Sequence, residues 1–85
     1  MVIRISPKFE KQYRRLPERI KEKAKEKEVV FRQNPYDPRL KTHKLCGRDK
    51  SCWAFWITKS CRIKFAFLPG GEILFLEIGP HNIYK

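Results

Sequence analysis

The apolar residues of this 85-residue chain change their spacing about halfway along it. In the first half, Phe9, Tyr13 and Leu16 recur at the intervals of three and four residues that place side chains on one face of a helix. In the second half, apolar residues form short runs of strand length that are bounded by turn signals. The pattern predicts helices followed by a β-sheet, within a single domain that spans residues 1–85.

Local signals indicate where these elements begin and end. Residues 2–5 are rich in β-branched side chains and predict a short strand. Ser6 followed by Pro7 is typical of a helix N-terminus. Pro17 should end this helix and open a second one, which the two prolines of residues 34–38 then end.

The second half predicts three strands at residues 52–58, 61–67 and 72–78, after a shorter strand near Lys44. Lys59-Ser60 and Pro69-Gly70-Gly71 are the turn signals between them. The expected fold class is α+β. It has an N-terminal strand and two helices packed on one face of a small twisted antiparallel sheet of about four strands.

Alternation across two-residue loops at Lys59-Ser60 and Gly70-Gly71 divides this sheet into two faces. The face expected under the helices is wholly apolar: Ala54, Trp56, Ile63, Phe65, Phe67, Leu74, Leu76 and Ile78. The other face is expected to mix charges with aromatic and aliphatic side chains: Arg62, Lys64, Glu77, Trp53, Phe55, Ile57, Ile73 and Phe75. Such a face suits single-stranded nucleic acid, because bases stack on rings and phosphates pair with cations. A Lys64–Glu77 cross-strand pair and a groove for a partner protein are the alternative readings.

Charge narrows the class of partner. The chain has 20 Lys and Arg against 9 Asp and Glu, a net charge of +11, which favours an anionic partner such as nucleic acid or an acidic protein. No apolar run approaches the roughly 20 residues that span a bilayer. The start of the chain lacks a signal-peptide pattern. A cytoplasmic location without membrane contact is therefore expected.

The pattern of cysteines favours a role as small packing residues over a role in disulfide bonds or metal binding. Cys46, Cys52 and Cys61 are odd in number and unevenly spaced, so they do not form a disulfide framework. With His43 they could be read as zinc ligands, but no Cys-x-x-Cys pair is present. No acidic cluster suits Mg²⁺ either. We therefore expect no metal and no small-molecule cofactor.

The C-terminal tail contains groups that suit RNA cleavage. Attack of a 2′-hydroxyl on its own phosphate needs a base, an acid and positive charge on the phosphorane. His81, with an ordinary pKa near 6.5, Arg62 and Tyr84 can supply these. From the residues alone, anion binding is nevertheless favoured over nuclease activity.

Five segments make a more specific combination: N-P-Y-D-P at 34–38, H-K-L-C-G at 43–47, W-A-F-W-I at 53–57, R-I-K-F at 62–65 and I-G-P-H-N-I-Y at 78–84. Together they resemble the RelE/ParE superfamily of toxin–antitoxin toxins, and most closely its RelE/YafQ-like mRNA endonuclease branch. The resemblance implies a compact α+β toxin that cleaves mRNA in the ribosomal A site, beside 16S rRNA, without a metal. It also implies an acidic antitoxin as partner.

The resemblance also implies roles for individual residues. Arg62 lies where the family contacts the scissile phosphate, and His81 lies where members have a His or Arg near the leaving group. Tyr84 resembles a tail tyrosine that orients the nucleotide, and His43 resembles a YafQ-like histidine that contributes to cleavage. An alternative role for His43 is that of a loop residue that caps a strand.

The chain departs from RelE itself, which carries two catalytic lysines on the strand where this chain has Trp53 and Phe55. Positive charge would then come from Lys44, Lys64 or Arg48. These three cations and the two rings are the expected RNA-binding residues. Two alternatives remain open: a ParE-like gyrase inhibitor, although that branch generally lacks the His-x-x-Tyr tail, and a non-catalytic RNA-binding member.

Overall fold

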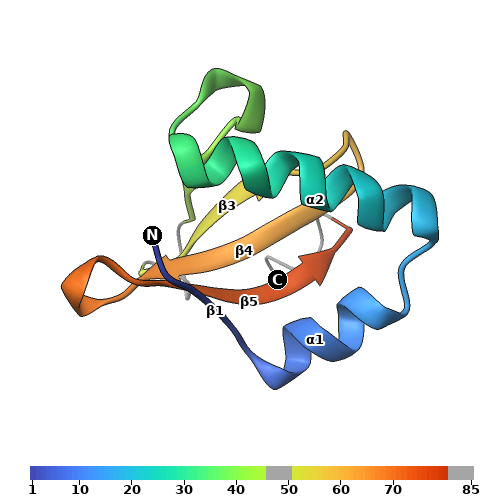
Figure 1. The fold of residues 1–85 in the computed structure, drawn as a ribbon, viewed down its shortest axis with the longest axis horizontal. Helices are drawn as coiled ribbons and strands as arrows, with labels where there is room; N and C mark the ends of the chain where they lie inside the picture. The colour runs from blue at the N-terminus through green and yellow to red at the C-terminus, as the bar shows by residue number, and fades with distance from the viewer. Residues whose placement is uncertain (46–50, 81–85) are drawn as a thin grey trace.

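The structure, a computed structural model, describes residues 1–45 and 51–80 and has the expected α+β architecture (Figure 1). Two helices follow an N-terminal strand, and the remaining strands come after them. The elements are β1 (Ile3–Ile5), α1 (Pro7–Arg14), α2 (Glu18–Gln33), the 3-10 helix η1 (Pro38–Leu40), β2 (His43–Lys44), β3 (Trp53–Trp56), β4 (Arg62–Phe67), the 3-10 turn η3 (Pro69–Gly71) and β5 (Ile73–Gly79).

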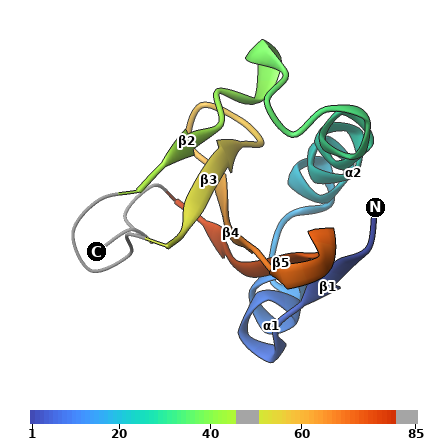
Figure 2. The same cartoon turned by 90° about the vertical axis from the view of Figure 1, so that its left-hand side faces the viewer.

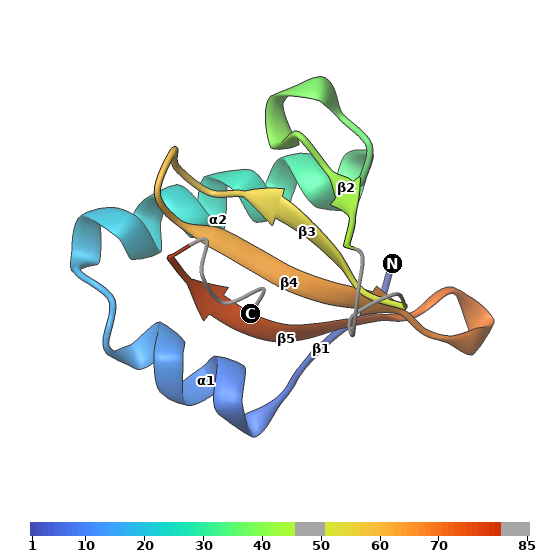
Figure 3. The same ribbon diagram turned by 180° about the vertical axis from the view of Figure 1, so that it is seen from behind.

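The sheet has five strands in the order β1-β5-β4-β3-β2. Strand β1 pairs with β5 in parallel, whereas the other neighbours are antiparallel. The expectation of an antiparallel sheet of about four strands is corrected on both points by β1, which joins the sheet as a fifth strand and pairs with the last strand in parallel. Figure 2 shows α2 on one side of the curved sheet, and Figure 3 shows the face turned away from it.

Helix α1 begins at the predicted cap and is tied there to the sheet. The Ser6 hydroxyl accepts the Phe9 N–H at 3.0 Å and donates to the Leu76 carbonyl at 2.8 Å. The Ser6 N–H donates to the Phe75 carbonyl at 3.0 Å. One residue therefore both caps α1 and fixes its start against β5.

Replacing Ser6 with alanine should lower the free energy of unfolding by about 1 kcal/mol, within the usual range for a lost N-cap. Ser6→Asp is the matched control, because it keeps a capping oxygen but cannot donate to the Leu76 carbonyl. Urea denaturation should rank the wild type first, Ser6→Asp second and Ser6→Ala last. Equal stability of Ser6→Ala and the wild type would show that the cap contributes nothing.

The core lies between the helices and one face of the sheet. Phe31 of α2 is fully buried, with ring centroids 4.7 Å from Phe55, 5.0 Å from Phe65 and 5.6 Å from Phe75. Phe9 of α1 packs 5.5 Å from the same Phe75 ring. Stacked and edge-to-face aromatic pairs of this kind add to the stability that burial of their area supplies.

Two bulges alter the predicted faces of the sheet. The loop at Lys59-Ser60 is confirmed, since Thr58 and Cys61 exchange backbone hydrogen bonds around it. The Ile57 N–H also donates to the Cys61 carbonyl at 2.8 Å, so Ile57 and Thr58 both lie opposite Cys61 and form a β-bulge. The register therefore shifts by one residue and reverses the predicted faces of β3.

The second hairpin differs in a similar way. Its loop is one residue longer than predicted, with Phe67 opposite Ile73, and a further irregularity between Lys64 and Phe65 shifts the register back. The predicted Lys64–Glu77 pairing is thus confirmed. The buried face contains Phe55, Ile57, Ile63, Phe65, Ile73, Phe75 and Ile78. The predicted positions of Phe55, Ile57, Ile73 and Phe75 on the other face were wrong.

Candidate nucleic-acid-binding and catalytic site

A row of directly opposed residues crosses four strands on the face turned away from the helices. His43 of β2 lies opposite Ala54 of β3, Ala54 opposite Lys64 of β4, and Lys64 opposite Glu77 of β5. Opposed residues of antiparallel strands share a face of the sheet. The register therefore brings two predicted site residues, His43 and Lys64, into one row.

Glu77 lies between two lysines at one end of this row. One carboxylate oxygen is 3.2 Å from Lys8 Nζ of α1, and the other is 3.4 Å from Lys64 Nζ. The Lys64 and Glu77 side chains are largely buried, with 11% and 16% of their surface exposed, whereas Lys8 is well exposed. The pairing fixes Lys64 on the sheet while the three side chains together remain cationic.

Arg62 lies in the neighbouring row, directly opposite Trp56. Its guanidinium carbon is 3.8 Å from the centre of the Trp56 ring, a cation–π distance. Its Nη1 donates to the Thr58 carbonyl at 2.9 Å and to the Lys59 carbonyl. Arg62 is only 8% exposed, so the hairpin turn and the indole hold this charge in place.

Lys41 brings a further cation to the same ring. Its ammonium nitrogen is 5.2 Å from the centre of Trp56. Lys41 has a left-handed backbone conformation, with a φ of 52°, and its carbonyl oxygen lies 3.0 Å from His43 Nδ1. One residue therefore places an ammonium over Trp56 and a hydrogen-bond acceptor beside His43.

The turn before Lys41 is held by Asp37. Its carboxylate accepts the Arg39 N–H at 2.9 Å and contacts the Arg39 guanidinium at 3.0 Å. These hydrogen bonds lower the pKa of Asp37 to about 2. Because the folded-state pKa is depressed, the stabilisation is present above the ordinary aspartate pKa and is lost as the pH falls through about 2.

The remaining predicted site residues lie elsewhere. Lys44 is exposed and lies opposite Trp53. Both residues therefore belong to the helix-covered face of the sheet, and not to the face that carries His43 and Lys64. Phe55 is fully buried against Phe31, and no base can reach its ring. The placement of Phe55 on an accessible face is therefore corrected. Arg48, His81 and Tyr84 lie outside the described residues.

Trp53 belongs to an aromatic cluster at the end of the sheet. Its ring centre is 5.8 Å from Tyr36 and 5.5 Å from Phe67, both of which are exposed. This cluster and the Arg62–Trp56 contact lie on opposite faces of the sheet. Trp53 and Trp56, although on one strand, therefore have different surroundings.

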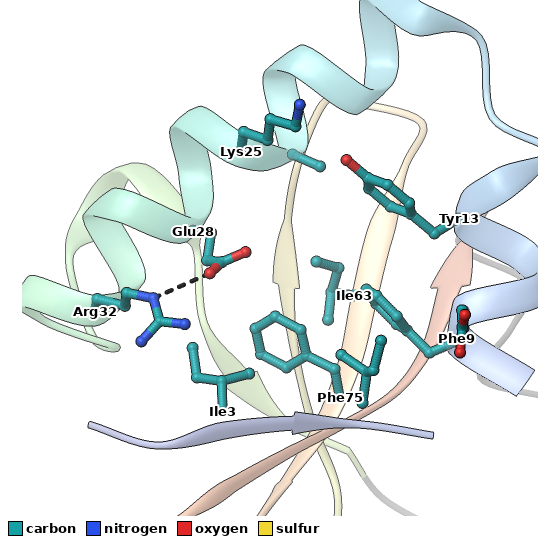
Figure 4. Close-up of a pocket in the computed structure, with 11 residues that line it drawn as sticks. Ile3, Phe9, Tyr13, Lys25, Glu28, Arg32, Ile63 and Phe75 are labelled. Atoms are coloured by element: carbon teal, nitrogen blue, oxygen red, sulfur yellow. Dashed lines mark hydrogen bonds and ion pairs between the residues drawn. The ribbon is translucent and has the colours of Figure 1, made fainter. Parts of the chain in front are cut away.

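A cavity of about 230 Å³ lies on the helix-covered side of the sheet (Figure 4). Ile3, Phe9 and Phe75 line it, and its rim carries a Glu28–Arg32 ion pair at 3.0 Å. Its lining is largely apolar, and the sheet separates it from Arg62, Lys64 and His43. Its two cations, Lys25 and Arg32, are balanced by the carboxylates of Glu10 and Glu28, so the cavity offers an RNA phosphate no net positive charge, and the candidate site lies on the other face.

The described residues add two observations on metals and membranes. In residues 1–45 and 51–80, no group of three His, Cys, Asp or Glu side chains is placed to hold a metal ion. Over the same residues, no helix has the length and apolarity needed to cross a bilayer. Burial raises the pKa of the Cys61 thiol, despite the opposing effect of Arg62, as expected for a cysteine used in packing.

Three residues of the site were missed from the sequence. Trp56 was expected under the helices, and Lys8 and Lys41 were not singled out. A tryptophan three residues before a hairpin loop, with an arginine two residues after it, was the available signal for the Trp56–Arg62 contact. The contacts of Lys8 and Lys41 join segments far apart in the chain and left no local signal.

The sequence matches no protein-family model and none of the curated proteins compared. Solved structures, however, match the fold over nearly the whole chain. The YoeB/ParE toxin from Agrobacterium tumefaciens is 19% identical with a TM-score of 0.81, and the alignment covers 95% of this chain and 99% of that one. YafQ from E. coli strain BL21(DE3) is 20% identical with a TM-score of 0.78, covering 95% and 93%.

An archaeal RelE from Pyrococcus horikoshii OT3, solved as a RelE–RelB complex, is 17% identical with a TM-score of 0.75, covering 93% of this chain and 92% of that one. At such identities the similarity establishes the fold. The chain therefore has the fold shared by the RelE, ParE, YafQ and YoeB toxins.

Proposed function

We propose that this protein is the toxin of a type II toxin–antitoxin system and acts in the cytoplasm as a ribosome-dependent, metal-independent endoribonuclease. It cleaves mRNA by attack of a 2′-hydroxyl on the adjacent phosphate. The observation that carries the proposal is the convergence of Arg62, Lys41, Lys64 and His43 on one face of a fold shared with YafQ. Cations on the same face of the sheet as a histidine suit a phosphate that gains charge in the transition state.

Each of these side chains takes a role in the proposed reaction. Arg62 contacts the scissile phosphate, and Lys64 supplies positive charge next to it. When His43 carries its proton on Nδ1, it donates to the Lys41 carbonyl, and Nε2 is then the basic nitrogen. His43 can thus accept the 2′-proton, while His81 protonates the 5′-oxygen and Tyr84 orients the nucleotide, as the family resemblance implies.

The proposed RNA path extends beyond the reacting phosphate. Lys44 and Arg48 are proposed to contact the RNA backbone, and Trp53 is proposed to stack on a base. Because Lys44 and Trp53 lie on the opposite face of the sheet from Arg62, the mRNA and the 16S rRNA of the A site can approach from different sides. The proposed protein partner is an acidic antitoxin, in keeping with the net charge of +11. The structural relative from Pyrococcus horikoshii was solved together with RelB.

Expression of the chain without an antitoxin provides the test. Growth should stop and mRNA should fragment, whereas the double variant His81→Ala/Arg62→Ala should permit growth and leave mRNA intact. Cleavage that survives in the double variant would overturn the proposal. Intact mRNA with inhibited supercoiling would indicate a gyrase inhibitor, and RNA that is bound but uncut would indicate a non-catalytic RNA-binding protein.

A further inference from the structure

The indole of Trp56 is contacted by cations from two different segments. Arg62 comes from β4 on one side of β3, and Lys41 comes from the segment before β2 on the other side. Their charged groups lie 3.8 Å and 5.2 Å from the centre of the ring. Strand β3 itself has the sequence Trp-Ala-Phe-Trp and carries no charge. The positive charge beside this strand therefore comes from its neighbours, and the two cations meet at one ring.

The Arg62 guanidinium is buried but has donors left for a ligand. Nη1 is held by the carbonyls of Thr58 and Lys59. Within residues 1–45 and 51–80, no protein acceptor is within hydrogen-bond range of its Nε or Nη2. A charged group that is more than nine-tenths buried normally has partners for its donors. An anion that approaches over this edge of the guanidinium would satisfy them.

The backbone at Lys41 adds an independent observation. A left-handed conformation is uncommon for a residue with a side chain, and it persists where the surrounding contacts require it. Here it allows the ammonium to lie over Trp56 while the carbonyl contacts the His43 ring. The position of Lys41 is therefore coupled to the ring on one side and to the candidate base on the other.

We propose that Trp56 is a positioning residue, whose ring holds the Arg62 guanidinium and the Lys41 ammonium as a pair for one RNA phosphate. This inference rests on the proposed function for the identity of the anion. Indole is the aromatic side chain that attracts cations most strongly. It fixes the direction of the Arg62 donors and leaves them available, whereas a carboxylate would accept their hydrogen bonds itself. Trp56 thereby supplies the site with charge that its own strand lacks.

The first test measures the position of Arg62 without RNA. In the full chain, nuclear magnetic resonance should show ring-current-shifted side-chain protons for Arg62 and slow exchange of its guanidinium protons. Trp56→Phe should retain part of this shift. Trp56→Leu should lose it, and its Arg62 guanidinium protons should exchange faster than those of the wild type. Arg62 side-chain exchange in Trp56→Leu that equals that of the wild type would overturn the proposal, whatever the protein binds.

The second test measures binding of a short single-stranded RNA whose 2′-hydroxyls are methylated, so that it cannot be cleaved. Loss of one phosphate contact reduces the slope of log affinity against log salt by about 0.7 for single strands. Trp56→Leu should reduce the slope by at least this amount, and Trp56→Phe by less. Arg62→Ala should reduce it by about the same amount, and the double variant should lose less than the sum of the two. Lys25→Ala, on the helix side of the sheet, is the charge control.

The outcomes separate this inference from the proposed function. Additive losses in the double variant, or an unchanged slope in Trp56→Leu, would overturn the positioning role. If the wild type binds RNA with the expected coupling but never cleaves it, the proposed nuclease function fails while the positioning role stands. If only Trp56→Leu is unfolded, the graded response of Trp56→Phe decides the question.

Discussion

Replacing Arg62 with alanine is expected to reduce the rate of mRNA cleavage by about 100- to 1,000-fold, the usual cost of removing one preorganised donor from a developing oxyanion. Arg62 is buried, stacked on Trp56 and bound to the turn carbonyls, so its guanidinium is fixed before RNA arrives. The measurement is the single-turnover cleavage rate on programmed ribosomes.

Arg62 also stabilises the hairpin turn, so its variant needs a control for folding. Arg62→Lys retains the charge but cannot provide a planar fork to both the carbonyls and a phosphate. It should cleave at an intermediate rate. Circular dichroism melting of the variants should separate loss of structure from loss of rate. Cleavage by a folded Arg62→Ala protein within a few-fold of wild type would exclude Arg62 from the reaction.

Replacing Phe31 with alanine is expected to lower the free energy of unfolding by about 3–5 kcal/mol, as for other large-to-small changes of a buried ring. Phe31 is fully buried and contacts three rings of the sheet, so its loss leaves a cavity between α2 and the sheet. Domains have a total stability of only about 5–15 kcal/mol. Guanidinium denaturation should therefore show a large decrease in the midpoint.

Val29 on the same helix provides the matched control, because it is exposed. Val29→Ala should change the free energy of unfolding by no more than about 0.5 kcal/mol. Phe31→Leu, which retains part of the volume, should lie between the two. A Phe31→Ala protein as stable as Val29→Ala would show that the contact between α2 and the sheet is not the core of the fold.

The features that the sequence predicted correctly depend on local chemistry. Ser6-Pro7 specifies the start of a helix, Pro17 separates the two helices, and Lys59-Ser60 forms the loop of a hairpin. Each of these signals acts within a few residues, so it can be read without knowing what packs against it. The α+β class follows from the order of the elements that these signals separate.

The register of the sheet could not be read in the same way. The extra residue at Ile57 and the irregularity between Lys64 and Phe65 have no local signature in their residue types. The Lys64–Glu77 pair was predicted correctly because a longer loop and the irregularity offset each other. The parallel pairing of β1 with β5 likewise joins the two ends of the chain, and local patterns do not specify such a contact.

Only part of the site was predicted, because the rest of it depends on the register of the sheet. Arg62 and Lys64 were placed on the correct face because both belong to one alternating strand. Their partners depend on the register: Trp56 reaches Arg62 only after the bulge shifts β3, and Lys41 reaches Trp56 only through its left-handed backbone. Phe55 was misplaced by the same one-residue shift. The roles of His81 and Tyr84 remain proposals.

The measurement that tests the central claim most directly is the chemistry of the mRNA ends formed on translating ribosomes. Purified protein should be added to ribosomes stalled on a defined message, and the new 3′ ends should be sequenced and their phosphates identified. Cleavage within the A-site codon, with a 2′,3′-cyclic phosphate or 3′-phosphate at the upstream end, is the predicted result. Full-length mRNA on ribosomes treated with folded wild-type protein would contradict the account.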